Sequence, residues 1–196
     1  MSKDESRWTD YYKVHKDRKP SKLLVKSLGF VKNKESALEL GAGTPVDAIF
    51  LSENGFKVTA VDKEPESENF FKEVSNVNIN FILSDFNDFS FSKETYDIVS
   101  AQRSLPFIEK KEDLFDTVNK IKGSLKNDGV FSGQLFGIND EWNIQGKKMS
   151  FVDKNEVQKL FSDMKIVYLS ECEEDGRTAN GNPKHWHIFD IIAIKN

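Results

Sequence analysis

The sequence has a single cysteine, Cys172, among its 196 residues. One thiol excludes an internal disulfide and any zinc site that needs several cysteines. Histidine is also scarce, with three residues, so we expect no dedicated metal site, although His185 and His187 could supply two ligands. Internal repeats and low-complexity tracts are missing as well. These absences point away from disulfide-rich, zinc-binding and repeat proteins.

An excess of basic charge is missing too. The 28 basic and 32 acidic side chains give a formal net charge of -4, which removes the usual electrostatic reason to expect nucleic-acid binding. No stretch approaches the roughly 18 apolar residues of a membrane helix. The charged start Met1–Arg7 is not followed by the apolar run of a signal peptide. We therefore expect a soluble cytoplasmic protein with no nucleic-acid or membrane partner.

The chain does contain enough apolar material for a packed core. Hydrophobic residues make up 38% of the sequence, and phenylalanine alone contributes 16 residues. A length of 196 residues is typical of one domain and is too short for two catalytic domains with a linker. We expect residues 1–196 to form a single domain.

Short apolar and β-branched segments recur along the chain and predict seven strands. Between the first five lie segments with helical spacing, at Asp47–Asn54, Glu66–Val74 and Lys111–Leu125. Strands that alternate with helices are typical of right-handed crossovers and a parallel sheet covered on both faces. The sequence predicts an α/β three-layer sandwich with a seven-stranded, mostly parallel, Rossmann-like sheet. Its strands would be Ala37–Leu40, Lys57–Val61, Ile79–Leu83, Tyr96–Ala101, Val130–Phe136, Lys165–Ser170 and Trp186–Ile194.

The two ends of the chain add an edge and a helix. Only the polar stretch Glu171–His185 joins the last two predicted strands, so we expect an antiparallel final strand, with Glu171–Asp175 in a solvated loop. Near the start, a helix is predicted that Pro20 ends or kinks. One face of this helix carries Trp8, Tyr11, Tyr12 and His15 at positions i, i+3, i+4 and i+7.

The strongest signal is a glycine loop followed by an acidic residue. Residues 37–47 read Ala-Leu-Glu-Leu-Gly-Ala-Gly-Thr-Pro-Val-Asp, which leaves a strand and enters a helix. Gly41 and Gly43 allow the backbone to turn tightly and to approach a ligand that a Cβ would hold off. Asp62 ends the second predicted strand, about twenty residues on, where a carboxylate can accept both hydroxyls of a ribose.

Two classes of nucleotide ligand use such a loop. A dinucleotide fold has the pattern Gly-x-Gly-x-x-Gly, whose third glycine exposes a helix N-terminus to the pyrophosphate. Val46 stands at that third position here, which weakens the case for a dinucleotide. Glu39, the acid before the loop, would repel a pyrophosphate but suits a sulfonium or amino group. The residues therefore favour a positively charged nucleoside.

These motifs resemble those of class I S-adenosylmethionine-dependent methyltransferases, and the resemblance covers nearly the whole chain. It rests on Glu39-x-Gly41-x-Gly43, Asp62 and Ser84-Asp85-Phe86. Segments 104–107, 132–137 and 183–187 are further similar to small bacterial tellurite-resistance or thiopurine-type methyltransferases. The chain departs from the family at Pro45, where a third glycine is common.

The resemblance implies a set of cofactor contacts for S-adenosylmethionine and its product S-adenosylhomocysteine. Asp62 would hold the ribose hydroxyls, and Asp85 would accept from the adenine amino group. An N-terminal cap over residues 1–20 would close the site, with an aromatic ring over the sulfonium. Each contact has a structural alternative: an ordinary turn, a turn cap, a core side chain or a helix that merely packs on the sheet. The implied contacts are Glu39, Gly41, Ala42, Gly43, Asp62, Lys63, Asp85, Phe86, Gln102, Trp8 and Tyr12.

Candidates for the methyl acceptor should follow the carboxyl ends of the strands. Arg103 would either hold an anionic acceptor or pair with Glu39 or another carboxylate. Trp142 would either wall the pocket or pack in a loop. Tyr12 is a further candidate for positioning the acceptor or accepting its proton.

The run Pro183–His187 offers a general base. If it is extended, His185 and His187 face one way and Trp186 faces the other. His185 would then either act as a base near neutral pH or form hydrogen bonds across the strand pair.

We therefore expect an S-adenosylmethionine-dependent methyltransferase that acts on a small molecule by in-line displacement, as a monomer or homodimer and without a metal. One alternative is a module that binds the cofactor without catalysis, and another is an NAD-dependent oxidoreductase. A nucleic-acid methyltransferase is disfavoured because the chain has neither a basic patch nor an Asn/Asp-Pro-Pro-aromatic tetrad.

Overall fold

The computed structural model describes residues 8, 11–12 and 14–196. The strands in this part are β1 (Ser36–Leu40), β2 (Lys57–Asp62), β3 (Ile79–Leu83), β4 (Tyr96–Ala101), β5 (Leu125–Gly137), β6 (Phe151–Val152), β7 (Met164–Arg177) and β8 (Pro183–Lys195). The helices are α2 (Lys22–Ser27), α3 (Val46–Glu53), α4 (Pro65–Lys72), α5 (Lys111–Ser124), α6 (Glu141–Ile144) and α7 (Lys154–Leu160). Two short 3-10 helices are η1 (Leu28–Phe30) and η2 (Leu105–Phe107). None of these helices has the length and apolarity needed to cross a bilayer.

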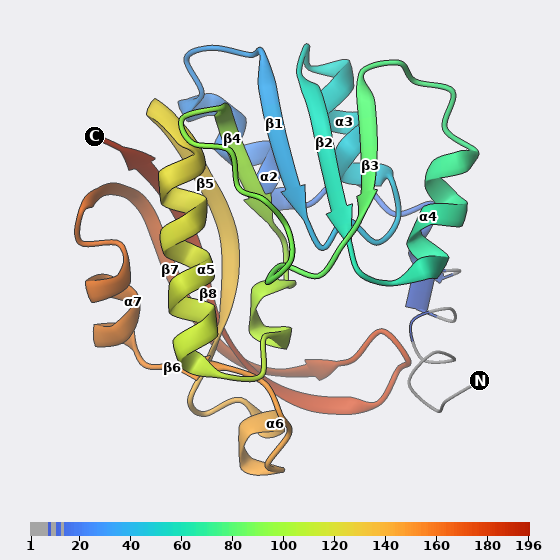
Figure 1. Cartoon of the computed structure of the whole chain (residues 1–196). Coiled ribbons are helices and arrows are strands. Elements are labelled where there is room, and N and C mark those ends of the chain that lie inside the picture. Colours follow the sequence, from blue (N-terminus) through green and yellow to red (C-terminus); the bar gives the residue numbers. More distant parts are fainter. Residues whose placement is uncertain (1–7, 9–10, 13) are drawn as a thin grey trace.

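All eight strands join one sheet, which confirms the predicted fold class (Figure 1). The strand order is β3-β2-β1-β4-β5-β8-β7, and the two-residue β6 pairs with β5 outside this path. The pairs within β1 to β5 are parallel, whereas β8 is antiparallel to both of its neighbours. The extra strand β6 and helices α6 and α7 were not predicted, because elements this short leave little periodic signal.

The prediction of a solvated loop at Glu171–Asp175 is wrong. These residues continue β7, and each pairs with a residue of β8, from Glu171 with Phe189 to Asp175 with His185. The turn between the strands spans residues 178–182. A paired edge strand with one face in solvent tolerates a run of charged side chains because the ladder satisfies its backbone.

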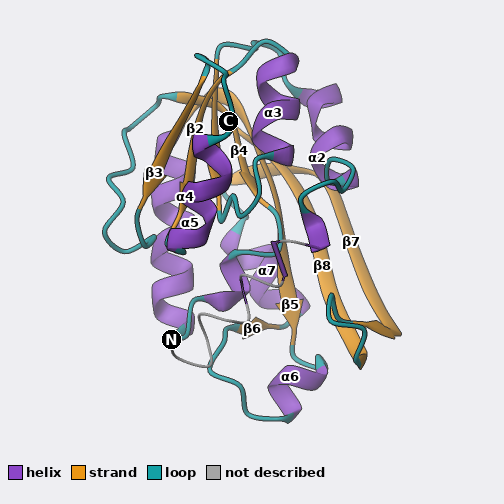
Figure 2. Ribbon diagram, turned by 90° about the vertical axis from the view of Figure 1, so that its right-hand side faces the viewer, coloured by secondary structure: helices purple, strands orange, loops and turns teal. Residues whose placement is uncertain are grey.

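Helices cover both faces of the sheet in three layers (Figure 2). On one face α5 contributes Leu114, Val118 and Ile121, which recur at helical spacing and are fully buried. The opposite face is covered by α2 and α3, whose Leu24 and Leu51 are equally buried. The core therefore consists of two apolar clusters separated by the sheet.

The sheet topology predicts which edge of the sheet binds a ligand. Strands β1 and β4 are neighbours, and the chain leaves β1 towards β2 on one side while β4 leads to β5 on the other. Ligands of open α/β sheets bind beyond the carboxyl ends of strands at such a switch point. In Figure 1 the far end of the β7–β8 hairpin curls beneath these carboxyl ends, and α6 lies nearby.

Candidate functional site

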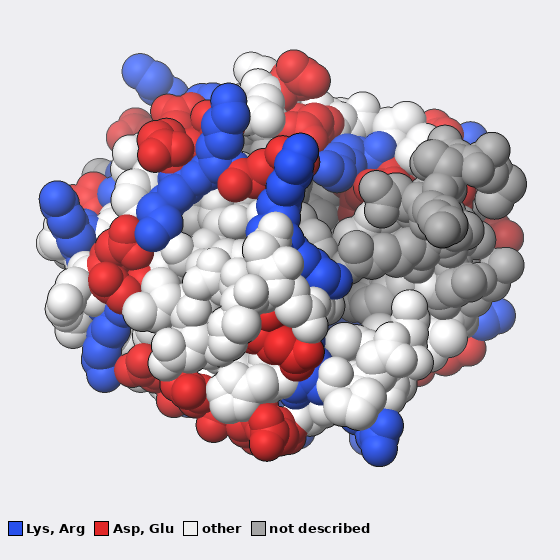
Figure 3. Space-filling view, turned by 90° about the horizontal axis from the view of Figure 1, so that it is seen from below, with Lys and Arg blue, Asp and Glu red and all other residues white. Residues whose placement is uncertain are grey.

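A cavity of about 1080 Å³ opens at the carboxyl ends of the parallel strands. Its walls come from the loops after β1 to β4, from the end of β5 with α6, and from the turn of the β7–β8 hairpin. Figure 3 views the molecule from this end and shows a hollow on the face, bordered by Lys and Arg side chains. The cavity therefore brings together residues that lie far apart in the sequence.

The glycine loop has the backbone conformation that its sequence predicts. Gly41 has a φ of 70° and Gly43 a φ of 57°, both in the left-handed region that favours glycine. A Cβ on Gly41 would overlap the Cβ of Ser104, and a Cβ on Gly43 would lie 2.9 Å from Cε1 of Tyr12. The close approach that we expected towards a ligand is thus also an approach to the protein's own side chains.

Asp62 links the end of β2 to this loop and lines the cavity. Its Oδ2 accepts from the Gly43 amide at 2.7 Å and its Oδ1 from the Glu64 amide at 2.9 Å. Burial raises the pKa of this carboxyl, although the backbone N–H groups act against the shift. The carboxylate keeps acceptor capacity for a ligand hydroxyl, because it can accept about four hydrogen bonds.

Glu39 lies beneath the loop and is not among the residues that line the cavity. Its side chain is 3% exposed, and its Oε2 has no hydrogen-bond partner within the described part of the chain. Burial raises the pKa of Glu39 well above its ordinary value, and the nearby Asp47 raises it further. The direct cofactor contact expected for this residue is therefore not seen in the cavity lining.

Asp47, in the first turn of α3, carries the partnered charge of this region. Its carboxylate forms a two-pronged ion pair with Arg18, at 2.8 and 3.0 Å, and accepts from the Ser21 amide at 2.8 Å. Neither Asp47 nor Arg18 was predicted from the sequence to belong to the site. Their spacing of 29 residues leaves no local signal that could have found the pair.

Asp85 and Phe86, after β3, lie on the cavity wall and also have structural contacts. Asp85 accepts from the backbone and side-chain nitrogens of Asn87 at 3.0 Å, which caps a turn, and Lys63 lies 3.7 Å away. Phe86 packs against the apolar core as well as the cavity. The binding and structural interpretations of these residues are compatible.

Gln102 is held firmly at the end of β4. Its Nε2 donates to the Ser132 carbonyl at 3.1 Å, and its Oε1 accepts from the Ser21 hydroxyl at 2.8 Å. These contacts fix the side chain where it lines the cavity. The amide thus joins β4, β5 and the chain before α2 at this wall.

Arg103 adopts a left-handed backbone, with a φ of 55°, which is uncommon for a residue with a side chain. Its side chain is exposed on the cavity wall, and its guanidinium carbon lies 5.6 Å from the ring centre of Trp186. Within the described residues it forms no ion pair, either with Glu39 or with another carboxylate. The structure does not show the expected structural pairing, and the guanidinium remains open to a ligand.

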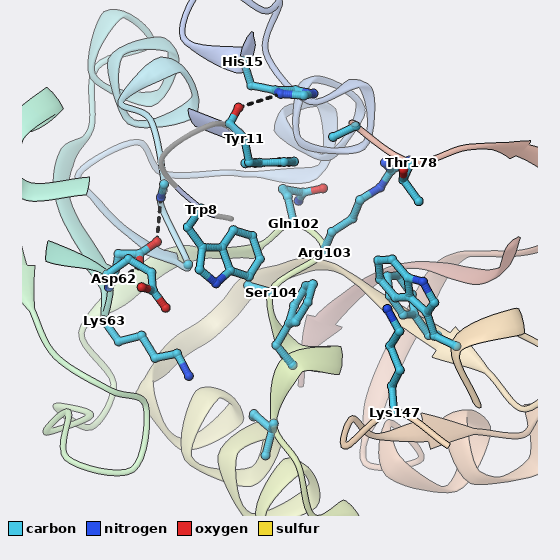
Figure 4. Close-up of a pocket in the computed structure, with 18 of the residues that line it drawn as sticks. Trp8, Tyr11, His15, Asp62, Lys63, Gln102, Arg103, Ser104, Lys147 and Thr178 are labelled. Carbon is cyan, nitrogen blue, oxygen red and sulfur yellow. Dashed lines mark hydrogen bonds between the residues drawn. The ribbon is translucent and has the colours of Figure 1, made fainter. Parts of the chain in front are cut away.

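The N-terminal residues that the structure describes reach into the cavity. The predicted cap falls partly on residues 1–7, 9–10 and 13, which lie outside the described part, but Trp8, Tyr11, Tyr12 and His15 are helical. Figure 4 shows Trp8 between Asp62 and Lys63 on one side and Gln102 and Arg103 on the other.

Tyr12 packs over Gly43 and is 3% exposed. Burial raises the pKa of its phenol, and the neighbouring Asp62 adds to the shift. The hydroxyl therefore stays protonated near neutral pH, which does not suit the role of general base.

Aromatic side chains continue from Trp8 across the cavity. The distance between ring centres is 5.1 Å for Trp8 and Phe107, 6.3 Å for Phe107 and Trp142, and 5.4 Å for Trp142 and Trp186. We call Phe107, Trp142 and Trp186 the aromatic wall. Trp142 both packs and lines the cavity, so its two expected roles coincide.

A buried ion pair supports this wall from behind. Lys184 Nζ lies 2.6 Å from both carboxylate oxygens of Asp140, and the two side chains are almost fully buried. The same ammonium lies 3.5 Å from the ring centre of Trp186 and 4.4 Å from that of Trp142. Sequence reasoning missed this pair because its partners are 44 residues apart.

His185 does not line the cavity. Its ring pairs across the hairpin with Asp175 at 2.8 Å and Glu173 at 3.3 Å, and these carboxylates raise its pKa. His187 likewise pairs with Glu171, while Trp186 lines the cavity on the opposite side, as the alternation of an extended strand predicts. The structure thus shows the cross-strand hydrogen bonds that were the alternative to a general base.

Comparison with known proteins agrees with the architecture. The family described as the methyltransferase domain matches residues 37–129. The chain has the class I S-adenosylmethionine-dependent methyltransferase fold. This confirms the resemblance inferred from the motifs. No protein with a curated description matches the sequence.

Solved structures similar to this chain share its fold at low sequence identity. TehB from Haemophilus influenzae is 21% identical with a TM-score of 0.74, over 88% of this chain. This chain spans only 61% of the length of TehB. The N-methyltransferase NodS from Bradyrhizobium japonicum WM9, in complex with S-adenosyl-L-homocysteine, is 14% identical with a TM-score of 0.68, over 91% of this chain and 89% of its own.

A third similar structure is a chain from a complex between the Haloferax volcanii Trm112 methyltransferase activator and a methyltransferase. It is 16% identical with a TM-score of 0.74, over 99% of this chain and 98% of its own. At these identities the likenesses establish the fold, while the substrate depends on the side chains of the site.

Proposed function

We propose that the protein binds S-adenosylmethionine and transfers its methyl group to a small-molecule acceptor. One observation carries the proposal: the glycine loop, Asp62 and Asp85 lie along one wall of a single cavity at the switch point of the sheet. This wall offers carboxylate acceptors to ribose hydroxyls and an adenine amino group. NodS, which shares the fold, was solved with S-adenosyl-L-homocysteine.

The charges around α3 fit a cationic nucleoside better than a dinucleotide. A dinucleotide places its pyrophosphate at the N-terminus of the helix that follows β1. Here Asp47 stands in the first turn of that helix and Glu39 lies buried close to it. Asp47 is ion-paired with Arg18 and accepts from the Ser21 amide, so its carboxylate already occupies the first turn of this helix. A helix end filled by a carboxylate is unsuited to a pyrophosphate.

When bound, S-adenosylmethionine supplies an activated methyl group whose sulfur accepts the bonding electrons as an acceptor atom attacks. The chain's own contribution is then to hold and align the two reactants. Asp62 would fix the ribose, while the hydrogen-bonded Gln102 would keep the end of β4 in place beside the reacting centre. Trp8 and the hairpin turn would exclude water from the cavity. His185 lies outside the cavity lining and the buried Tyr12 phenol stays protonated, so neither would take a proton from the acceptor. An acceptor atom that arrives with a free electron pair and no proton to lose would need no general base.

A small acceptor is supported by the volume of the cavity and by the segments that border it. Its volume of about 1080 Å³ is large enough for one nucleoside cofactor together with a small molecule. The turn at residues 178–182 and the aromatic ring of Trp8 both border this space. A macromolecular substrate would have to pass these segments to reach the methyl group.

The first test is calorimetric binding of S-adenosylhomocysteine and of NAD to the wild-type protein. We expect the protein to bind S-adenosylhomocysteine and not NAD. Asp62→Ala should lose at least tenfold in affinity for S-adenosylhomocysteine, about 1.4 kcal/mol, because the ribose loses a charged acceptor. Asp62→Asn, which keeps the side-chain shape, should show a smaller loss. Asp88→Ala is the matched control, since Asp88 is exposed and lies outside the cavity lining.

The outcomes separate the alternatives. Binding of NAD alone would make the protein an oxidoreductase candidate and overturn the proposal. Unchanged affinity in Asp62→Ala would remove Asp62 from the site. Binding of S-adenosylhomocysteine with no turnover of S-adenosylmethionine on any acceptor would favour a binding module without catalysis.

A further inference from the structure

The part of the cavity away from the glycine loop has a different chemistry. The loop side carries the carboxylates of Asp62, Glu64 and Asp85 with one lysine, Lys63. The side built by η2, α6 and β8 carries the aromatic wall and the cations Arg103 and Lys147. An acceptor must approach the methyl group from the side away from the cofactor. The residues of this second side therefore indicate which kind of acceptor the cavity binds.

Two cations of this side stand against aromatic rings instead of carboxylates. Arg103 lies over Trp186 at 5.6 Å, and Lys147 Nζ lies over Trp142 at 4.7 Å. Trp142 and Trp186 meet edge to face, with ring centres 5.4 Å apart and an angle of 63° between the ring planes. Neither cation forms an ion pair with any residue that the structure describes. In Figure 4 Arg103 extends towards Thr178 and Lys147 points up into the same region.

The strained backbone of Arg103 adds an independent observation. A residue with a side chain is strained at a φ of 55° relative to glycine, and such strain is found at binding sites. No ion pair of Arg103 with a described residue offsets this cost, and its contact with Trp186 lies at 5.6 Å. A ligand that accepts from the guanidinium would offset it.

The acidic residues near this side do not cancel the cations. Glu141 lines the cavity, but its carboxylate accepts from the His185 amide at 2.9 Å and from Gln145 Nε2 at 2.6 Å. Glu109 and Asp113 belong to the remaining wall at the start of α5, next to Lys110. Arg177, the last residue of β7, adds a third cation to the aromatic side, and its Nη1 donates to the Gly181 carbonyl at 2.7 Å. The cations of this side therefore outnumber Glu141.

We propose that the acceptor is a planar aromatic molecule with an anionic substituent, held between the aromatic wall and Arg103, with Lys147 as the second cation. This proposal rests on the proposed function, whose cofactor side it leaves unchanged. Aromatic rings attract one another when they stack offset or edge to face, beyond the gain from burying their surface. A planar guanidinium binds carboxylate oxygens through two parallel hydrogen bonds, so it recognises both the charge and its geometry.

The test measures fluorine NMR line broadening of small probes on the protein saturated with S-adenosylhomocysteine. The probes are 4-fluorobenzoate, its neutral analogue 4-fluorobenzamide and the non-aromatic 4-fluorocyclohexanecarboxylate. We expect 4-fluorobenzoate to bind at least tenfold more tightly than either of the others. Equal binding of the benzamide would remove the anionic group from the proposal, and equal binding of the cyclohexane probe would remove the aromatic ring.

Variants locate the probe. Arg103→Gln should abolish the preference for benzoate over benzamide, and Lys147→Gln should reduce it about threefold. Lys148→Gln is the matched control, because Lys148 is exposed in the same segment but lies outside the cavity lining. Trp186→Leu should weaken both aromatic probes. A preference that survives Arg103→Gln would overturn the proposal.

Two further measurements keep the result decisive. Arg103→Gly, which removes the side chain but suits the left-handed backbone, should unfold at or above the wild-type temperature and bind benzoate as weakly as Arg103→Gln. Repeating the titration without S-adenosylhomocysteine separates the two proposals. If the cofactor analogue fails to bind but benzoate still depends on Arg103, the acceptor site stands and the cofactor assignment fails.

Discussion

At the residue scale, Gly41 is required by the protein before any ligand is considered. Its left-handed φ of 70° coincides with a position where the Ser104 Cβ occupies the space of a side chain. Ser104 cannot retreat easily, because its hydroxyl donates to the Leu40 carbonyl at 2.7 Å. The glycine therefore lets β1 and the loop after β4 approach each other at the switch point.

Gly41→Ala is expected to destabilise the protein by about 2–5 kcal/mol, from left-handed strain together with overpacking. The measurement is the urea midpoint of unfolding. Gly123→Ala is the control, since Gly123 lies in α5 with no atom within 4 Å of the added Cβ, and it should gain about 0.5–1 kcal/mol. A Gly41→Ala midpoint equal to the wild-type value would contradict the steric argument.

At the element scale, Asp140 joins three segments behind the aromatic wall. It is the N-cap of α6, where it accepts from the Trp142 amide at 3.0 Å, and it also accepts from the His187 amide at 3.3 Å in β8. Its ion pair with Lys184 brings the ammonium under the rings of Trp142 and Trp186. The position of the four-residue helix α6 is thus fixed mainly by the buried ion pair of Asp140 with Lys184.

Removing one partner of this pair should cost about 3–5 kcal/mol, because the other charge is left buried and unpaired. We expect this loss in Asp140→Asn and in Lys184→Met separately. The double variant should lose clearly less than the sum of the two. Urea unfolding of all four proteins measures the coupling, with near-UV circular dichroism reporting the two tryptophans. Strictly additive losses would show that the pair does not act as a unit.

At the scale of the whole molecule, buried carboxyl groups set the pH dependence of stability. Burial raises the pKa of Glu39 and of Asp62 above their ordinary values of 4.5 and 3.8. The folded protein therefore holds these protons more tightly than the unfolded chain, so the free energy of unfolding falls as the pH rises through this region towards the folded-state pKa values. Asp175 and Glu173 raise the pKa of His185 above its ordinary value of 6.5. Its contribution to the free energy of unfolding is therefore also lost as the pH rises.

Asp97 acts in the opposite direction. Burial alone would raise its pKa, but the Ser36 amide and the Lys126 ammonium outweigh burial and lower it below 3.8. Its contribution to stability is present above that pH and is lost on acidification. The greatest stability is thus expected in mildly acid solution. At lower pH the stabilisation from the Asp97 carboxylate is lost, and at higher pH the stabilisation from the protonated Glu39 is lost.

Glu39→Gln tests this account, because the amide stays neutral at every pH. The variant should match the wild type at pH 4 and unfold at a higher temperature at pH 8, by about 2–4 °C, the shift that 1 kcal/mol produces at this chain length. Glu53→Gln, in the exposed face of α3, is the control and should show no pH-dependent gain. A Glu39→Gln protein less stable at pH 8 than the wild type would show that the carboxylate is stabilised in the fold.

Local patterns in the sequence determined most of the fold and part of the site. The short apolar runs of β1 to β5, the helical spacing in α3 to α5 and the left-handed preference of Gly41 and Gly43 all act over a few residues. They placed Asp62 and Asp85 at the ends of parallel strands, and the structure keeps them there. Such features are readable because neighbouring residues alone produce them.

Tertiary structure alone decided which side chains meet. It buried Glu39 beneath the loop, turned His185 to the outer face of the hairpin and left Arg103 over Trp186 without a carboxylate partner. It also assembled the aromatic wall from three segments separated by tens of residues. Contacts of this kind depend on how packed elements are oriented in space, and no spacing along the chain encodes that orientation.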